Sequence, residues 1–161
     1  ERLGALFAQC GLGGAAALPL LDRIEAERYT RTFEIYPEVL PTLEALRGRG
    51  LRLGVCSNWD WDLERQFDHN GIRDRFDFVL TSAVVGYRKP HPAIFERACA
   101  EGGVAPGEVL FVGDTWLDDI VGATAAGLVA VHVAREPCDQ VDHRQVPCVP
   151  DLSGVVDLLG G

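Results

Sequence analysis

Residues 109–119 read Val-Leu-Phe-Val-Gly-Asp-Thr-Trp-Leu-Asp-Asp, an apolar run followed by a polar turn. Four apolar residues in succession, Val109 to Val112, predict a short strand that is buried on both faces. A helical pattern follows from Leu117 to Ala126 and stops at Gly127. Strand, polar turn and helix in this order form the repeating unit of a parallel α/β sheet.

The same alternation continues on both sides of this stretch. It predicts strands at residues 51–56, 76–81 and 128–133, and helices at residues 37–47, 60–69, 92–100 and 152–159. Residues 134–150 contain three prolines and little apolar pattern, which favours a surface loop. Residues 3–10 and 18–33 have helical spacing and are separated by glycines. We therefore expect an α/β core at residues 36–161, with helices on both faces of the sheet, and a helical segment at residues 1–35.

Composition excludes several functional classes. The chain has 161 residues, 47% of them hydrophobic, and a net charge of -9. This charge disfavours nucleic acid or an anionic membrane as the main partner, and no apolar run approaches the roughly 20 residues of a membrane span. The five cysteines are scattered and lack CxxC spacing, which predicts reduced thiols in a cytoplasmic protein. A zinc site or disulfide involving Cys138, His143 and Cys148 matches no zinc signature and is disfavoured.

Three carboxylates lie just after the strand at residues 109–112. Asp114 follows the strand, and Asp118 and Asp119 fall in the first turn of the next helix. Clustered carboxylates repel one another, and a divalent cation relieves that repulsion. Oxygen ligands with few other protein groups suit Mg²⁺, so Asp114, Asp118 and Asp119 are the predicted metal ligands. Helix capping by Thr115 or Asp118 is the alternative, but it leaves Asp114 unexplained.

Two further segments place polar groups after strands or between elements. Ser57 and Asn58 follow the strand at residues 51–56, and Lys89 is the only lysine in the chain. A hydroxyl, an amide and an ammonium group can together bind a phosphoryl group, so Ser57, Asn58 and Lys89 are the predicted phosphate-binding residues. We predict Ser57, Lys89 and Asp114 as catalytic residues. A helix cap for Ser57 and Asn58, and a solvated position for Lys89, are the alternatives.

Taken in order, these segments resemble motifs two, three and four of the haloacid dehalogenase superfamily, in its phosphatase-like subgroup. Ser57 matches the hydroxyl residue of motif two, Lys89 the lysine of motif three, and Asp114 with Asp119 the acidic pair of motif four. The resemblance covers residues 36–161 and implies a Rossmann-like core of this family. It also implies that residues 1–35 are a partial helical cap or a dimerisation segment.

One family segment has no counterpart here. Members of the superfamily begin with a strand that ends in Asp-x-Asp, whose first Asp is the nucleophile, and no such segment precedes Tyr36. The only Asp-x-Asp in the chain, Asp60-Trp61-Asp62, is predicted to begin a helix. In the family the absent strand lies between those corresponding to residues 51–56 and 109–112. We therefore expect a truncated sheet with exposed edges, direct pairing of those two strands, or completion by a strand from a partner chain or a second copy in a homodimer.

The resemblance implies a Mg²⁺-dependent hydrolase of small phosphate esters. Without the Asp nucleophile, attack would use metal-bound water or a substitute carboxylate, and turnover would be slow or promiscuous. One alternative is a non-catalytic binding or assembly domain that keeps the phosphate site. Another is a 2-haloacid dehalogenase, whose chemistry needs the same absent Asp and no metal.

Overall fold

The computed structural model describes residues 18–29, 34–136 and 146–160. The chain divides into two compact units, Glu1–Glu34 and Ile35–Gly161. In the first unit, the described helix is α2 (Leu18–Tyr29). The helix predicted at residues 3–10 lies outside the described residues. The assignment of residues 1–35 as a cap or dimerisation segment stays a prediction.

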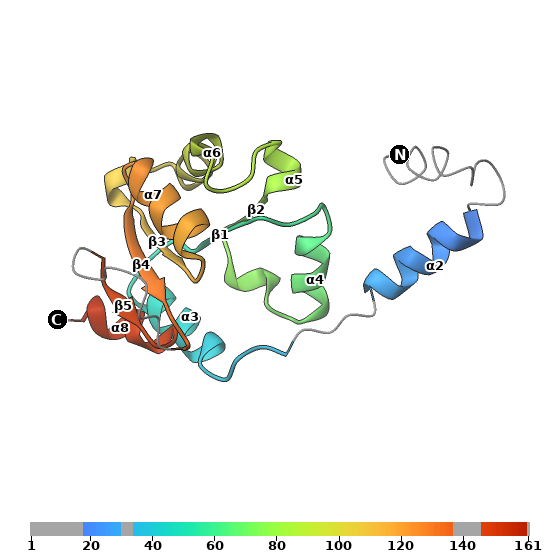
Figure 1. The fold of residues 1–161 in the computed structure, drawn as a ribbon. Coiled ribbons are helices and arrows are strands. Elements are labelled where there is room, and N and C mark those ends of the chain that lie inside the picture. Colours follow the sequence, from blue (N-terminus) through green and yellow to red (C-terminus); the bar gives the residue numbers. More distant parts are fainter. Residues whose placement is uncertain (1–17, 30–33, 137–145, 161) are drawn as a thin grey trace. The chain divides into compact units, whose positions relative to one another are not determined.

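The second unit alternates short strands with helices, as the sequence predicted (Figure 1). Its strands are β1 (Gly54–Ser57), β2 (Phe78–Thr81), β3 (Leu110–Gly113), β4 (Val129–Val133) and β5 (Cys148–Val149). Its helices are α3 (Val39–Gly48), α4 (Leu63–His69), α5 (Ser82–Val85), α6 (Pro92–Gly102), α7 (Gly122–Ala125) and α8 (Ser153–Leu158). Single 3-10 turns lie at Arg73–Arg75 and Pro106–Glu108, and a π-helical turn at Trp116–Val121.

All strand pairs are parallel, which confirms the α/β class, but they form two sheets. β1 pairs with β2, and the other sheet has the order β3-β4-β5. Among the described residues, no strand pairs with the edge of β1 that faces away from β2, or with the edge of β3 that faces away from β4. We call these the open edges. Direct pairing of β1 with β3, one of the expected arrangements, does not occur.

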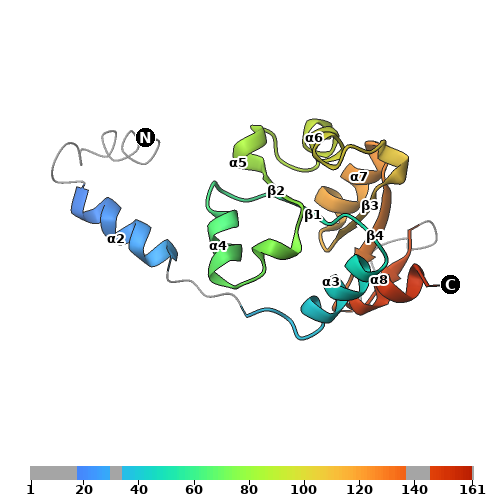
Figure 2. The same cartoon turned by 180° about the vertical axis from the view of Figure 1, so that it is seen from behind.

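Helices cover both faces of the β3-β4-β5 sheet. Phe111 and Ala130 point to one face and pack with Ile94 and Phe95 of α6, both 0% exposed, and with Ala123 of α7. Strand residues of alternate position point to the other face. There, Val131, Val133 and Val149 pack with Val155 of α8. Figures 1 and 2 both show α3 beside α8 on this second face.

The structure differs from the sequence expectations at four local points. The helix predicted from residue 60 begins at Leu63, because residues 61 and 62 form a turn before it and Asp62, which accepts from the Trp59 ring nitrogen, is its N-cap residue. The helix predicted at residues 117–126 begins as the π-helical turn Trp116–Val121. The loop predicted at residues 134–150 contains β5, a strand too short to show periodicity. A short helix, α5, follows β2 directly and is capped by Thr81, whose hydroxyl accepts from the Val84 N–H at 3.4 Å.

None of the helices formed by the described residues has the length and apolar character that a membrane crossing requires.

Candidate phosphate and metal site

The segment that carries Lys89 is held at both ends. α5 ends at Val85 and is capped by Gly86, whose φ of 84° lies in the left-handed region that glycine tolerates. α6 begins with Pro92, and the preceding His91 caps it, its Nδ1 accepting from the Ala93 N–H at 3.2 Å. The connecting residues 86–91 are therefore short and restrained, which brings Lys89 to the carboxyl ends of the strands.

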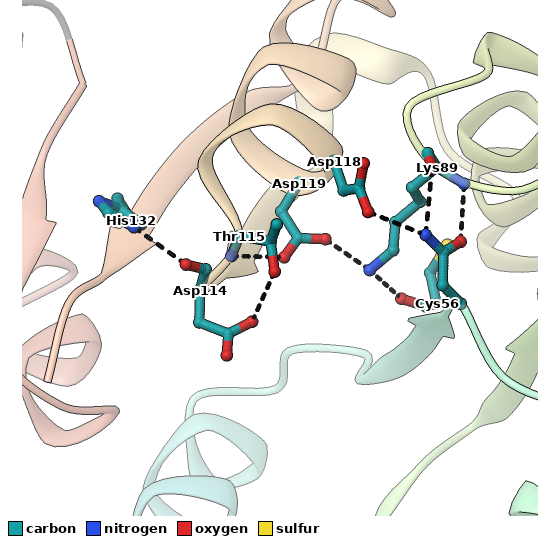
Figure 3. A network of polar contacts seen from close by, with 8 residues as sticks. Cys56, Lys89, Asp114, Thr115, Asp118, Asp119 and His132 are labelled. Atoms are coloured by element: carbon teal, nitrogen blue, oxygen red, sulfur yellow. Dashed lines mark hydrogen bonds and ion pairs between the residues drawn. The ribbon is translucent and has the colours of Figure 1, made fainter. Parts of the chain in front are cut away.

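The ammonium group of Lys89 joins the two sheets. Its Nζ donates to the Asp119 carboxylate at 2.5 Å and to the Cys56 carbonyl oxygen on β1 at 3.0 Å (Figure 3). Its side chain is 11% exposed and that of Asp119 is 5% exposed, so this is a buried ion pair. The same Nζ lies 5.4 Å from the centre of the Phe111 ring, within range of a cation–π interaction. One side chain thus contacts the end of β1, the strand β3 and the turn after it.

Asp119 is the most constrained carboxylate of the site. One of its oxygens accepts from Lys89, and the other accepts from the Thr115 N–H at 3.0 Å. The π-helical turn that contains it packs directly against Gly113, where an added Cβ would lie 2.4 Å from the Asp119 Cβ. Gly113 is therefore required for this approach. With both oxygens engaged, Asp119 orients Lys89 and the loop after β3.

The side chain of Asn58 bridges two segments. Its Oδ1 accepts from the Lys89 main-chain N–H at 2.7 Å. Its Nδ2 donates to the Lys89 carbonyl oxygen at 3.1 Å and to an Asp118 oxygen at 3.2 Å. The carboxamide is therefore committed to groups of the protein itself.

Asp114 is the exposed carboxylate of the set. One of its oxygens lies 3.5 Å from the Thr115 hydroxyl, and its main-chain carbonyl lies 3.1 Å from the His132 Nε2. Figure 3 shows Asp114 on the His132 side of the site and Lys89 on the opposite side of Asp119. His132 is 4% exposed and packs edge-on against Trp116, with ring centroids 5.5 Å apart.

The structure joins four of the predicted site residues in one hydrogen-bonded network, namely Asn58, Lys89, Asp118 and Asp119. Thr115 links Asp114 to this network. Ser57 ends β1, beside the Cys56 carbonyl that Lys89 contacts. The described residues contain no group of three or more His, Cys, Asp or Glu side chains arranged around a metal position. The assigned roles in catalysis, phosphate binding and metal binding therefore stay predictions.

Sequence reasoning missed three contributors. The Cys56 carbonyl, the Thr115 N–H and His132 all hold site residues in place. Two of these act through the main chain, which leaves no residue-type signal. His132 had a weak signal, because it is a polar residue within the apolar strand β4 and lies opposite Gly113 in the parallel register.

A small open cavity of about 270 Å³ lies beside Asp114. Its lining residues are Asp114, His132, Val133, Ala134, Arg135 and Glu136. Arg135 donates to Glu38 at 2.6 Å and lies 3.5 Å from the centre of the Tyr36 ring. This wall of the cavity is therefore fixed by the residues that precede α3.

Burial controls the chemistry of Cys56 more than its neighbours do. Burial raises the pKa of the Cys56 thiol from 9.0 to about 11, while Lys89 lowers it in part and Asp119 raises it. Cys56 is therefore a neutral thiol at physiological pH, which makes it a poor nucleophile.

This raised pKa predicts a loss of stability at alkaline pH. Between pH 9 and about 11 the unfolded thiol releases its proton while the folded thiol keeps it, so the free energy of unfolding falls as the pH rises through this window. The stabilisation that the protonated Cys56 thiol gives the folded state is fully present below pH 9. Urea unfolding of the reduced protein from pH 8 to 10.5 should show a flatter decline for Cys56→Ala than for the wild type. Cys148→Ala, at an exposed cysteine, serves as the control and should keep the wild-type slope. Parallel curves for Cys56→Ala and the wild type would contradict the assignment.

Comparison with known proteins places this geometry in a family. Residues 8–127 match the family model for haloacid dehalogenase-like hydrolases. The chain is 36% identical over 159 residues to the haloacid dehalogenase-like hydrolase domain-containing protein 3 of Mus musculus, covering 95% of this chain and 63% of that protein. It is 37% identical over 121 residues to the glyceraldehyde 3-phosphate phosphatase of Methanopyrus kandleri, covering 73% of this chain and 51% of that protein.

Solved structures agree with the sequence comparison. The crystal structure of an HAD phosphatase from Thermococcus onnurineus superposes with a TM-score of 0.76 at 33% identity, covering 84% of this chain and 62% of that one. A 2-haloacid dehalogenase from Pseudomonas syringae superposes with a TM-score of 0.70 at 33% identity, covering 79% of this chain and 54% of that one.

The chain belongs to the haloacid dehalogenase-like hydrolases, which confirms the family that its motifs indicated. It spans less than two thirds of the length of the relatives described above.

Proposed function

We propose that the protein is a Mg²⁺-dependent hydrolase of small phosphate esters. The observation that carries this proposal is the position of the Lys89 ammonium, held between the end of β1 and Asp119 at the carboxyl ends of the strands. Ligands of open α/β sheets bind at this edge. A fixed cation there neutralises the charge of a phosphoryl group, and a phosphatase relative and a phosphatase structure support this substrate class.

Each site residue has a defined part in this proposal. Lys89 and Ser57 bind the phosphoryl oxygens. Within the described part of the chain, the Lys89 ammonium donates to the Cys56 carbonyl and to Asp119, and its third N–H remains for a phosphate. Asp114, Asp118 and Asp119 supply the negative charge that attracts Mg²⁺. Because both oxygens of Asp119 already accept hydrogen bonds, we assign direct ligation to Asp114 and Asp118.

The residues present fit Mg²⁺ better than a metal that needs a complete protein cage. Mg²⁺ keeps several waters and takes one or two carboxylates together with substrate phosphate, and an exposed Asp114 suits that mode. When bound, the ion would offset the charge that develops on the phosphoryl oxygens.

We further propose that a strand completes the sheet between the open edges. Lys89 contacts both the end of β1 and the turn after β3, so the two sheets converge at the site while their facing edges are unpaired among the described residues. Open strand edges are templates for pairing with another strand. In this proposal the completing strand carries the attacking carboxylate; a water molecule is the alternative nucleophile.

Reduced cysteines support a cytoplasmic location, which we also propose. Cys56, Cys99 and Cys148 are free thiols in the described part of the chain.

The function is tested by turnover of p-nitrophenyl phosphate with Mg²⁺ and with EDTA. We expect EDTA and Asp114→Asn each to reduce turnover by about a hundredfold, because charge stabilisation in the transition state is lost. Asp157→Asn is the matched control, because this exposed carboxylate lies on α8, outside the network. Equal turnover with Mg²⁺ and EDTA would contradict the metal assignment.

The same experiment separates the alternatives. A folded chain that binds inorganic phosphate without turnover would favour the non-catalytic binding domain, and sedimentation velocity would then show whether the open edges are paired in a dimer. Metal-independent release of halide from a 2-haloacid would favour the dehalogenase alternative, which the similarity to the Pseudomonas syringae enzyme keeps open.

A further inference from the structure

We propose that Asn58 is a positioning residue that holds Lys89 and Asp118 in place, and that it does not bind phosphate itself. The inference rests on the proposed function, because it concerns how the phosphate-binding lysine of that site is oriented. It differs from the role that the sequence suggested for Asn58, which was direct donation to a phosphoryl oxygen.

Asn58 makes a two-point contact with the main chain of Lys89. Asn58 Oδ1 accepts from the Lys89 N–H at 2.7 Å, and Asn58 Nδ2 donates to the Lys89 carbonyl at 3.1 Å. One carboxamide thus satisfies the donor and the acceptor of a single residue, as a neighbouring strand would. The main chain around it is also closed by a turn, in which the His91 N–H donates to the Arg88 carbonyl at 2.8 Å. Asn58 adds partners for the N–H and the carbonyl of Lys89 itself.

The reach of the lysine side chain depends on where its Cα is held. Lysine has a flexible four-carbon stem, and ordering it costs conformational entropy. When the Cα is anchored, the side chain has fewer conformations to lose as Nζ binds Asp119 and the Cys56 carbonyl, the two groups that it contacts. The anchor therefore acts on the ammonium group at the far end of the side chain.

A further contact of Asn58 reaches the carboxylate side of the site. Asn58 Nδ2 also donates to Asp118 Oδ2 at 3.2 Å, so one amide group orients the lysine segment and the turn after β3 together. Because this donor already serves two acceptors, a phosphoryl oxygen would have to displace one of them. In a positioning role, Asn58 keeps all three of the hydrogen bonds described above.

The test uses the fact that Lys89 is the only lysine in the chain. Labelling with ¹⁵N,¹³C-lysine gives one backbone amide signal and one ε-methylene signal, and both report on this residue. The ε-methylene is bonded to Nζ, which lies 5.4 Å from the centre of the Phe111 ring, so we expect the ring current to shift its protons. Both signals are read in the wild type, in Asn58→Ala and in Asn58→Asp, with and without inorganic phosphate.

For Asn58→Ala we expect the Lys89 amide to exchange with solvent about tenfold faster, because a hydrogen bond of ordinary strength is lost. We also expect the ε-methylene protons to move toward the shift of free lysine, and phosphate binding to weaken. Asn70→Ala is the matched control, because Asn70 Nδ2 donates to a main-chain carbonyl, that of Gln66, at 2.7 Å in a different part of the molecule. It should leave both lysine signals unchanged.

Asn58→Asp keeps the acceptor for the Lys89 N–H and loses both donated bonds. Asn58→Asp should retain the protection of the Lys89 amide while altering the ε-methylene shift. If Asn58→Ala does not fold, Asn58→Asp alone tests the proposal. An unchanged ε-methylene shift in both variants would overturn the proposal. Weaker phosphate binding with both lysine signals unchanged would instead show that Asn58 contacts phosphate directly. None of these readouts needs turnover, so a failure of the positioning role can be distinguished from a failure of the proposed hydrolase function.

Discussion

Replacement of Lys89 by methionine is expected to lower the free energy of unfolding by about 3–5 kcal/mol, because it leaves the buried Asp119 carboxylate without its partner. The two side chains are 11% and 5% exposed and 2.5 Å apart, so solvent offers little compensation for the lost cation. Methionine has a similar length and no charge, which limits the change in packing. Chemical denaturation at neutral pH, followed by circular dichroism, measures the effect.

Arg97→Met provides the matched control for this loss. Arg97 donates to Glu101 at 2.6 Å on the surface of α6, where the side chains are 58% and 37% exposed. Exposed pairs of this spacing contribute about 0.3–0.5 kcal/mol, so this variant should remain close to the wild type. The double variant Lys89→Met with Asp119→Leu should recover much of the lost stability, because it removes both buried charges. Equal stability of Lys89→Met and Arg97→Met would show that the buried pair contributes nothing.

Gly113→Ala is expected to lower the free energy of unfolding by about 3 kcal/mol, the upper part of the usual range for overpacking. The new Cβ would lie 2.4 Å from the Asp119 Cβ and 2.6 Å from its Oδ2. Asp119 cannot move away freely, because Lys89 and the Thr115 N–H hold its two oxygens. The substitution should therefore also displace the Lys89 ammonium and reduce any phosphatase activity. Denaturation and the Lys89 ε-methylene signal measure the two effects.

Gly107→Ala is the control for this substitution. A Cβ at Gly107 meets no atom within 4 Å, and its φ lies outside the left-handed region. Its stability should equal or slightly exceed that of the wild type, because alanine reduces the freedom of the unfolded chain. If Gly113→Ala were as stable as Gly107→Ala, the close approach of Asp119 to β3 would not be a constraint.

The open edges show the difference between what a local sequence pattern predicts and what the tertiary structure decides. Apolar runs predicted both β1 and β3, and both strands exist. Their pairing depends on residues distant in the sequence, and periodicity within a strand holds no information about its neighbour. The sequence suggested that a strand belongs between them only through the family resemblance. The structure shows two sheets whose ends are linked by the Lys89 side chain.

The sequence by itself determined the parallel α/β class, the order of its main strands and helices, and the polar residues at the strand ends. These follow from local causes: apolar runs of strand length, helical periodicity, and the termination of helices by glycine and proline. Only the tertiary structure decided what each polar group does. Asp118 and Asp119 are neighbours in sequence, yet one accepts from Asn58 and the other is buried against Lys89, because successive residues of a helical turn point in different directions. Asn58 and Lys89 are 31 residues apart and meet because β1 and the segment before α6 converge at the same edge of the sheet.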